Sequence, residues 1–484
     1  MCALLLSPFN YRATANSAII RSQTSCTLVA FMFNDISRLL YHNPSQLYYG
    51  IAVTDVDGDG AFEVIVAGFG FPNLVLKWDG SSFRNVPSFA LADPERQAIG
   101  VAACDIDGDG QEEIYILNTD TFAGQKRFAD RLLDRVDGEW TDLFSLSSNK
   151  HVLNLTAGRS VIALDRCSTG AYGFFVANYG GPLRLYELDE DGHLNDTAPA
   201  AGLDLVTGGR SALALPLVTD HMDIFAGNEG GPNFLFCNRG DGTFEEMAQE
   251  LGLHDPAQNA RGLTVLDANE DGLFDLVCGN WEGPHRLFIH QPNGRFEDAA
   301  PPEMAAPSRV RTVIAADFDN DGYEEIFFNN IGQPNRLFAR RNGHWQPIEI
   351  GAALEPAGLG TGAAVGDFDE NGRLELLISH GESAAQALAL YATPENRNHW
   401  LRVLPLTVYG APARGAVVVL EMFGRTQRRA IDAGSGYLCQ MEPVAHFGLG
   451  GQTQINRVRV HWPDGATAMI NNPACDQLLQ VAHP

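Results

Sequence analysis

The chain has 484 residues, with 60 acidic and 33 basic side chains and a formal net charge of −27. A hydrophobic fraction of 45% with 27 Phe is enough to build a core, so the composition excludes a disordered chain. The acidic balance argues against nucleic acid as a partner, because a phosphate-binding surface needs excess Lys and Arg. The apolar runs are also too short for a membrane span.

Residues 1–31 differ in composition from the rest of the chain. They contain no Asp or Glu and are rich in Ser, Thr and Asn. Their short apolar runs lack a basic start, so they do not form a clear signal peptide. The composition suits a transit peptide or a mis-assigned start codon, and we favour the second, with Met32 as the start. We expect residues 1–31 to be unstructured and to contribute nothing to the fold.

Repeat units organise residues 32–396. Asp-rich loops recur in register, and the first two and the last three begin 50 residues apart; their first residues are Asp55, Asp105, Asp267, Asp317 and Asp367. Two more units fit between the second and third loops. There, residues 159–165 and 210–216 match residues 261–267, but the acidic loops are lost. Seven units of this length with short strands are typical of a β-propeller.

Each unit is predicted to form four strands. A fourth strand begins at an aromatic or apolar residue after a polar turn in six units: Phe83, Trp140, Leu194, Phe244, Phe296 and Trp345. The seventh lies at the front, where residues 33–36 repeat the pattern of residues 244–247. An N-terminal strand that completes the last blade closes the ring and removes its open edges. We therefore predict an all-β, seven-bladed propeller with residues 33–36 as the outer strand of the blade that carries Asp367.

The five loops have the oxygen-rich pattern of a Ca²⁺ site. Asp or Asn stands at positions 1, 3 and 5, Gly at 6, a backbone carbonyl is available at 7, and a carboxylate stands at 9. The predicted ligands, loop by loop, are Asp55, Asp57, Asp59, Ala61 and Glu63; Asp105, Asp107, Asp109, Gln111 and Glu113; Asp267, Asn269, Asp271, Leu273 and Asp275; Asp317, Asp319, Asp321, Tyr323 and Glu325; Asp367, Asp369, Asn371, Arg373 and Glu375.

An apolar residue or Cys at position 12 excludes an EF-hand, which needs Glu there. Asp and Gly also favour turns without any metal. Because five such loops recur in register, we expect about five Ca²⁺ sites, with a structural role.

Residues 397–484 are expected to form a compact β domain of about six strands. Trp400 and residues 417–420, 458–460 and 478–481 supply its apolar or alternating segments. A pairing of Cys439 with Cys475 stays open, because no spacing rule supports it.

A family resemblance rests on these loops and on four C-terminal blocks, residues 398–403, 432–440, 446–450 and 458–463. The loops look like the FG-GAP/VCBS repeats of integrin α propellers, and the blocks resemble the ASPIC/UnbV domain. Together they resemble the plan of the cartilage acidic protein 1 family over residues 32–484. Cys439 stands where Ser is expected, and no Cys-rich module follows, which indicates a bacterial-type member. The resemblance implies a secreted, periplasmic or cell-surface Ca²⁺-binding protein.

The sequence offers little catalytic chemistry. It has no Gly-x-Ser-x-Gly motif, and its 13 His lack a metal-ligand spacing. His446 and His461 are candidate catalytic residues, but a His among aromatic residues is more often packed and hydrogen bonded. We predict a non-catalytic recognition, adhesion or scaffold protein, monomeric, with an unknown protein or glycan partner. The alternative is an enzyme or enzyme accessory whose chemistry lies in residues 397–484.

A second candidate site consists of four arginines. Arg159, Arg210, Arg261 and Arg311 each lie six residues before the first position of their loop. Because the first strand of a blade runs beside the central channel, we expect their guanidinium groups to gather at one mouth of it, with Asn178, Asn228, Asn280 and Asn330 on the same side. Each Arg either pairs with an acid of a neighbouring blade or helps to bind an anionic ligand.

Overall fold

The computed structural model describes residues 31–434 and 437–484. The expectations for residues 1–31 therefore lie almost wholly outside the described residues. The described chain is nearly all β-strand, with short helical turns between strands, so the predicted all-β class is confirmed. Within this part of the chain, no helix is long and apolar enough to cross a membrane.

The described strands before residue 393 form five four-stranded sheets and one eight-stranded sheet over residues 158–246. We divide the eight-stranded sheet into two groups of four in chain order, and we call each of the resulting seven groups a blade. In chain order, the blades are: β2 (Tyr48–Thr54), β3 (Glu63–Gly68), β4 (Leu74–Trp78), β5 (Phe83–Asn85); β6 (Ala98–Cys104), β7 (Glu113–Asn118), β8 (Arg131–Val136), β9 (Glu139–Asp142); β10 (Gly158–Leu164), β11 (Gly173–Pro182), β12 (Arg184–Leu188), β13 (Leu194–Asp196); β14 (Val206–Leu215), β15 (Asp223–Asn228), β16 (Phe234–Asn238), β17 (Phe244–Glu246); β18 (Ala260–Leu266), β19 (Asp275–Asn280), β20 (Arg286–His290), β21 (Phe296–Asp298); β22 (Val310–Ala316), β23 (Glu325–Asn330), β24 (Arg336–Arg341), β25 (His344–Pro347); β26 (Gly360–Gly366), β27 (Glu375–His380), β28 (Ala389–Ala392) and β1 (Asn34–Asp35).

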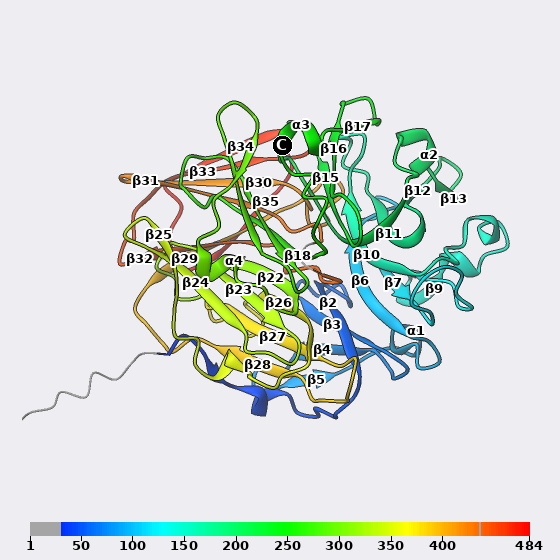
Figure 1. Cartoon of the computed structure of the whole chain (residues 1–484), viewed down its shortest axis with the longest axis horizontal. Helices are drawn as coiled ribbons and strands as arrows, with labels where there is room; N and C mark the ends of the chain where they lie inside the picture. The colour runs from blue at the N-terminus through cyan, green and yellow to red at the C-terminus, as the bar shows by residue number, and fades with distance from the viewer. Residues whose placement is uncertain (1–30, 435–436) are drawn as a thin grey trace, which may run out of the picture. The chain divides into compact units, whose positions relative to one another are not determined.

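The blades form a closed ring. The first strands contact one another in the order β2, β6, β10, β14, β18, β22 and β26, and β26 contacts β2. Figure 1 shows most of these first strands converging on the centre. The ring closes as predicted, because β1 pairs with β28 through Asn34 and Ala392. The Phe33 ring packs edge-on against Phe318, with ring centroids 4.9 Å apart, and so anchors this closing strand in the core.

Short helical turns follow the fourth strands and lead toward the next blade or to the start of the ring. They are α1 (Phe89–Ala92), α2 (Ala198–Ala201), α3 (Ala248–Leu251), α4 (Pro302–Ala305), η1 (Ser37–Leu39), η2 (Leu143–Ser145), η3 (Lys150–Val152) and η4 (Ala352–Leu354).

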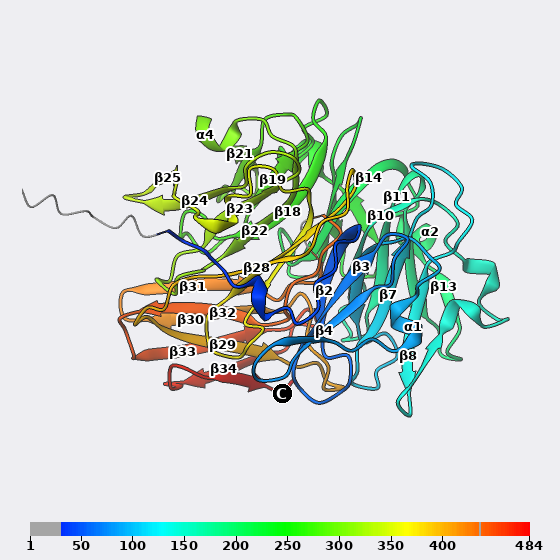
Figure 2. The same ribbon diagram turned by 90° about the horizontal axis from the view of Figure 1, so that it is seen from below.

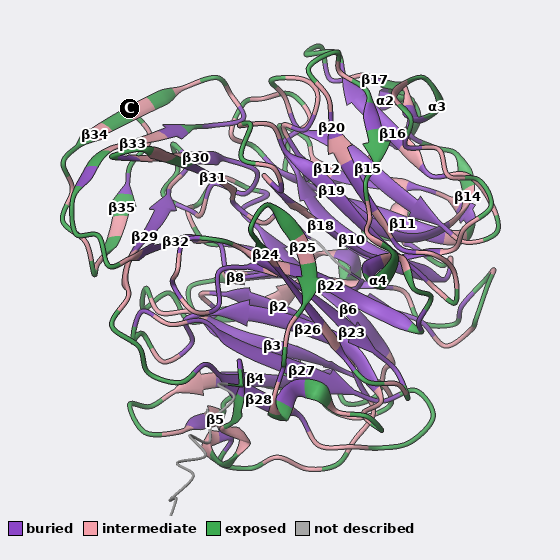
Figure 3. Ribbon diagram, turned by 60° about the vertical axis from the view of Figure 1, so that its left-hand side comes forward, coloured by how far each residue is buried: buried purple, intermediate pink, exposed green. Residues whose placement is uncertain are grey.

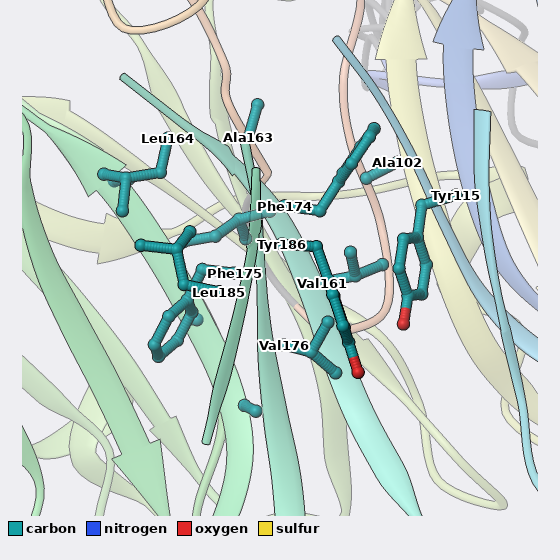
Figure 4. Packing of buried hydrophobic residues seen from close by; sticks show 14 of the residues in the cluster. Ala102, Tyr115, Val161, Ala163, Leu164, Phe174, Phe175, Val176, Leu185 and Tyr186 are labelled. Atoms are coloured by element: carbon teal, nitrogen blue, oxygen red, sulfur yellow. The ribbon is translucent and has the colours of Figure 1, made fainter. Parts of the chain in front are cut away.

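The core lies between the faces of neighbouring blades. Figure 3 shows the blade strands mostly buried and the loops exposed. Figure 4 shows one such interface, where Tyr115 of β7 lies beside Tyr186 of β12, with ring centroids 6.1 Å apart. Phe174 of β11 packs on the same Tyr115 ring at 5.3 Å. Burial of these large rings stabilises the contact between adjacent blades.

The C-terminal strands form two sheets around a core of their own. The sheets are β32–β29–β35 and β31–β30–β33–β34, and their strands are β29 (His399–Pro405), β30 (Val417–Met422), β31 (Arg425–Ala430), β32 (Ala445–Gly450), β33 (Ile455–His461), β34 (Thr467–Asn471) and β35 (Leu478–Val481). Figure 2 shows them, in orange and red, beside the ring. The core includes Leu401, Val418, Phe447 and Trp462. The strongly polar β31 has no apolar alternation, which is why the sequence did not reveal it.

Residues 431–434 and 437–441, which we call the channel segment, lie between β31 and β32 in the chain and enter the ring. The Gln440 side chain accepts from the Ala103 N–H at 2.7 Å and donates to the Ala103 carbonyl at 3.0 Å. Ala163 donates its N–H to the Ala433 carbonyl at 2.7 Å. The channel segment therefore bonds to first strands of two blades, and Phe31–Pro484 forms one compact unit.

Candidate functional site

Each acidic loop is held by hydrogen bonds that use only part of its oxygen atoms. Asp105 accepts from the Gly108 N–H with one oxygen and from the Gly110 N–H with the other. Glu113 accepts from the Ile106 N–H through Oε2. Gly110 lies in the left-handed region, at φ +91°, which explains the Gly at position 6. The second oxygen of the position-9 Glu remains available inside the loop.

Three loops bring the predicted acids close together. In each, single oxygens of the acids at positions 1, 3 and 9 lie within 4.8 Å of one another. The sets are Asp55, Asp57 and Glu63; Asp105, Asp107 and Glu113; Asp317, Asp319 and Glu325. Backbone carbonyls could complete an oxygen cage for a hard cation such as Ca²⁺.

Some buried carboxylate oxygens fit a bound cation. Asp317 Oδ1, Asp369 Oδ1 and Glu375 Oε1 have no hydrogen-bond partner among the described residues, although Asp317 and Glu375 are each only 1% exposed. Burial, with the nearby Asp321 and Asp319 charges, raises the pKa of Asp317 to about 8. Burial also raises the pKa of Glu113 to about 10. Such carboxylates are costly to keep ionised without a cation, so the residues fit a divalent metal.

The loop at Asp55 already contains a cation of the chain itself. Lys77 Nζ lies 2.6 Å from Asp57, 2.7 Å from Asp59 and 2.9 Å from Glu63. Burial opposes its charge, but the hydrogen bonds to these three acids raise the pKa of Lys77 above its ordinary value. The ammonium group thus lies among three of the predicted ligands. The sequence analysis missed Lys77 because it lies on the third strand, outside the repeated motif.

The position equivalent to Lys77 differs between the blades, as the strand register shows. In the second blade it is Asp134, whose Oδ1 is buried and unpartnered within the described chain. In the sixth blade it is Ala339, which is too small to reach the acids. These two loops therefore lack an internal ammonium of this kind.

The loops at Asp267 and Asp367 are intermediate. Asp275 is one carbon shorter than Glu, and its oxygens accept from the N–H groups of Ala268 and His290, at 2.8 Å each. Arg402 of β29 lies 2.9 Å from Asp367 Oδ2. The Asp267 loop thus offers fewer free oxygens, whereas the Asp367 loop keeps the unpartnered oxygens of Asp369 and Glu375.

The two blades without acidic loops still turn between their first and second strands, each around one buried Asp. The third blade keeps the position-1 Asp and a glycine at positive φ, whereas the fourth has a turn one residue shorter around Asp223, at the start of the second strand. Asp165 accepts from the N–H groups of Thr169 and Gly170, and Gly170 has φ +79°. Asp223 accepts from the N–H groups of Val218 and Thr219. The third blade therefore forms a turn of the same length without the acids at positions 3, 5 and 9.

The C-terminal sheets dock on the loop end of the ring. Arg414 is fully buried and donates to Glu112 at 2.8 Å and to the Val53 carbonyl at 3.0 Å. Gly448 donates its N–H to Asp317 Oδ2 at 3.0 Å. The hydrogen bond from Gly448 thus links the C-terminal sheets directly to Asp317, the acid at position 1 of the sixth-blade loop.

His446 and His461 are placed differently. His446 Nε2 lies 2.6 Å from Asn320 Oδ1, and its ring is parallel to that of Trp400. Burial, with the neighbouring Arg402 and Arg429 charges, holds the pKa of His446 well below its usual value. A cavity of about 120 Å³ between ring and C-terminal sheets is lined by His446 but not by His461. Cys439 and Cys475 are free thiols, so they do not pair.

The four predicted arginines do gather. They line one cavity of about 500 Å³, which we call the arginine cavity, at the end of the first strands away from the acidic loops. Tyr437 of the channel segment lines it too. Arg210 pairs with Glu229, Arg261 lies 3.1 Å from the same carboxylate, and Arg311 pairs with Glu382. Three of the four arginines thus form ion pairs with acids of the chain, as expected for a purely structural role.

Arg159 is the exception. Its guanidinium donates to the carbonyls of Gly158 and Phe122, and no ion pair of Arg159 occurs among the described residues. Each of the four predicted asparagines pairs with the residue just before the arginine of its blade, so they lie on the same side as predicted, but they do not line the cavity. Each instead donates to a proline carbonyl four residues later and fixes a turn: Asn178, Asn228, Asn280 and Asn330.

Comparison with protein-family models agrees with this architecture. An FG-GAP-like repeat model matches residues 43–116, 220–278, 267–328 and 319–378, and an ASPIC and UnbV model matches residues 409–484. The solved structure of Saccharomyces cerevisiae Sqt1 covers 76% of this chain and 99% of its own at 10% identity, with a TM-score of 0.44.

Two curated relatives are far more similar. Cartilage acidic protein 1 of Xenopus tropicalis is 47% identical over 91% of this chain and 74% of its own length. The Homo sapiens protein of the same name is 47% identical over 91% of this chain and 73% of its own. Identity of this extent over most of both chains shows common descent, and the chain belongs to the cartilage acidic protein 1 family.

Proposed function

We propose that the chain is a Ca²⁺-stabilised, non-catalytic recognition or scaffold protein that works outside the cytoplasm. The observation that carries the proposal is the set of buried, unpartnered carboxylate oxygens at the acidic loops, together with the docking of the C-terminal sheets on those loops. A cation in the loop at Asp317 would neutralise the acid that also binds Gly448. It would thereby stabilise the joint between the ring and the C-terminal sheets.

The loops do not support the proposal equally. Those at Asp105, Asp317 and Asp367 keep available oxygens and form the three proposed Ca²⁺ sites. At Asp55 the Lys77 ammonium competes for the same oxygens. At Asp267 the position-9 carboxylate is already hydrogen bonded on both oxygens. The expectation of about five sites is thus narrowed to three.

The enzymatic alternative has less support. His446, its main candidate, is hydrogen bonded to Asn320 and packed on Trp400, which suits a structural role. Nothing in the described residues places His461 in the same cavity.

Calcium titration of the full chain tests the proposal. Isothermal calorimetry after metal removal should give about three sites, with affinities suited to extracellular calcium, 10⁻⁴ to 10⁻³ M or tighter. Mg²⁺ at the same concentration should bind less well, because it demands a smaller octahedral site. Absence of Ca²⁺ binding would show that the loops serve only as turns.

A further inference from the structure

The arginine cavity carries more positive charge than its own acids neutralise. Four guanidinium groups face it, against the carboxylates of Glu229 and Glu382. The third acid of the lining, Asp120, pairs with Arg127 at 2.7 Å. Two formal positive charges therefore remain uncompensated in a protein whose net charge is −27.

The electrostatics of neighbouring groups reflect this excess. Burial, reinforced by the adjacent Arg210 charge, lowers the pKa of Arg261 to about 10. Burial alone would raise the pKa of the Tyr437 hydroxyl, yet the four arginines lower it below its ordinary value. The Nε atoms of Arg159, Arg261 and Arg311 are buried without a hydrogen-bond partner in the described chain. The acids of the chain therefore leave these N–H donors free to bind a ligand.

The internal acids show which anion the cluster accommodates. The Glu229 carboxylate bridges Arg210 and Arg261, and Glu382 reaches Arg311 from the cavity edge, where its side chain is 43% exposed. A carboxylate bound between two guanidinium groups is the arrangement that Arg favours. Arg159 lacks an internal acid and could bind an incoming carboxylate through its own guanidinium group.

Aromatic rings hold the guanidinium groups in place. Phe122 and Tyr179 pack edge to face at 5.3 Å, and Arg210 lies 4.3 Å from the centre of the Tyr179 ring. Trp281 supports Arg311 at 4.4 Å in the same manner. Stacked arginines lose little conformational freedom when they bind an anion. A cavity of about 500 Å³ has the size of a small-molecule site.

We propose that the arginine cavity binds a ligand with two carboxylate groups, either a free small dicarboxylate or the acidic end of a peptide. One group contacts Arg159, and the second displaces or joins Glu382 at Arg311. The inference names the ligand class of the proposed recognition function, on which it rests, but it does not depend on calcium binding. Arg159, Arg311 and Glu382 are the residues that set the affinity.

Calorimetry on the full chain in saturating Ca²⁺ tests this inference with four probes. The probes are glutarate, a tetrapeptide that ends in Asp, the same peptide amidated at its C-terminus, and a sulfated disaccharide. We expect glutarate or the Asp-ended peptide to bind, and amidation to weaken the peptide at least tenfold. Binding by glutarate alone identifies a free ligand, and tighter binding by the peptide identifies a chain end. Failure of both, or tighter binding of the sulfated disaccharide, overturns the inference.

Two cavity variants should change the affinity for the probe in opposite directions, and a third variant serves as the control. Arg159→Gln should weaken the better probe at least tenfold, whereas Glu382→Gln should strengthen it severalfold because it removes a competing internal carboxylate. Arg239→Gln, at an exposed pair with Glu245 away from the cavity, should change nothing. Unchanged affinity in both cavity variants overturns the inference, and the half-exposed Glu382 keeps the test decisive if Arg159→Gln does not fold. Loss of Ca²⁺ binding with retained probe binding would instead refute only the calcium proposal.

Discussion

The acidic loops of the first and sixth blades have nearly the same sequence but opposite surroundings. In the first blade, the Asp57 and Asp59 side chains are about half exposed, and Lys77 lies among the acids. In the sixth, the equivalent Asp319 and Asp321 are less exposed, and Asp321 pairs with Arg341 at 3.3 Å. Ala339 stands in place of the lysine, and Gly448 donates to Asp317, which is 1% exposed. The position-9 acids of the two loops are equally buried, at 1% exposed. Buried charge requires compensation, whereas exposed charge is solvated. The first loop therefore carries a cation among three of its acids. The sixth has an arginine only at Asp321, so the calcium proposal requires a cation from solution for Asp317 and Glu325.

Of the tests of this comparison, removal of Ca²⁺ by a chelator should change the stability of the protein most. EGTA removes every Ca²⁺ ion and leaves the buried acids of the sixth blade uncompensated. Each site contributes about 2.7 kcal/mol of stability when free metal exceeds the dissociation constant 100-fold. Differential scanning calorimetry with and without EGTA should show a large fall in melting temperature. An unchanged melting temperature would contradict the calcium proposal.

A matched pair of substitutions should separate the two loops. Asp317→Asn removes a buried ligand and should lower the Ca²⁺ stoichiometry by one, at a cost of about 2.7 kcal/mol when free metal exceeds the dissociation constant 100-fold. Asp57→Asn removes only one of three acids around Lys77 and should cost less than about 1 kcal/mol. Calcium calorimetry and urea unfolding measure both quantities. Equal effects of the two substitutions would remove the distinction between the loops.

A reciprocal exchange of the lysine should convert one loop into the other. Lys77→Met leaves the first loop without a cation, so in EGTA it should lose roughly 2 kcal/mol, and added Ca²⁺ should restore it. Ala339→Lys places an ammonium in the sixth blade and should reduce the destabilisation by EGTA. Urea unfolding in both buffers measures the effect. If Lys77→Met is as stable as the parent chain in EGTA, Lys77 does not stabilise the first loop by compensating its acids.

A further effect concerns pH and the turn after the second strand of the fifth blade. His285 accepts the Asn280 N–H in the fifth blade, where Asn233 and Asn335 play this part in the fourth and sixth. Burial, with a contribution from Arg336, lowers the pKa of His285 from 6.5 to about 3. The unfolded chain thus binds the proton first, and stability falls as the pH decreases below 6.5, by about 2 kcal/mol at pH 5.

His285→Asn should make this acid sensitivity shallower, because Asn can accept the same N–H without titrating. Urea unfolding between pH 7 and pH 5 measures the slope for both proteins. An identical slope would indicate that other groups control the acid response.

The sequence by itself determined the repeats, the ring closure and the register of the arginines. These features depend on local patterns: a turn with Gly at positive φ, short apolar strands, and a fixed spacing from Arg261 to Asp267. The pairing of Asn34 with Ala392 followed from the missing seventh strand. Such features could be predicted because every blade repeats the same local chemistry.

Only the tertiary structure decided which loops keep free oxygens and which arginines keep their charge uncompensated. Lys77 lies on a third strand, and Gly448 comes from a distant sheet. Tyr437 reaches the arginine cavity because the channel segment enters the ring. The compensation of a charge depends on groups that are near in space and remote in sequence, so no spacing rule could reveal it.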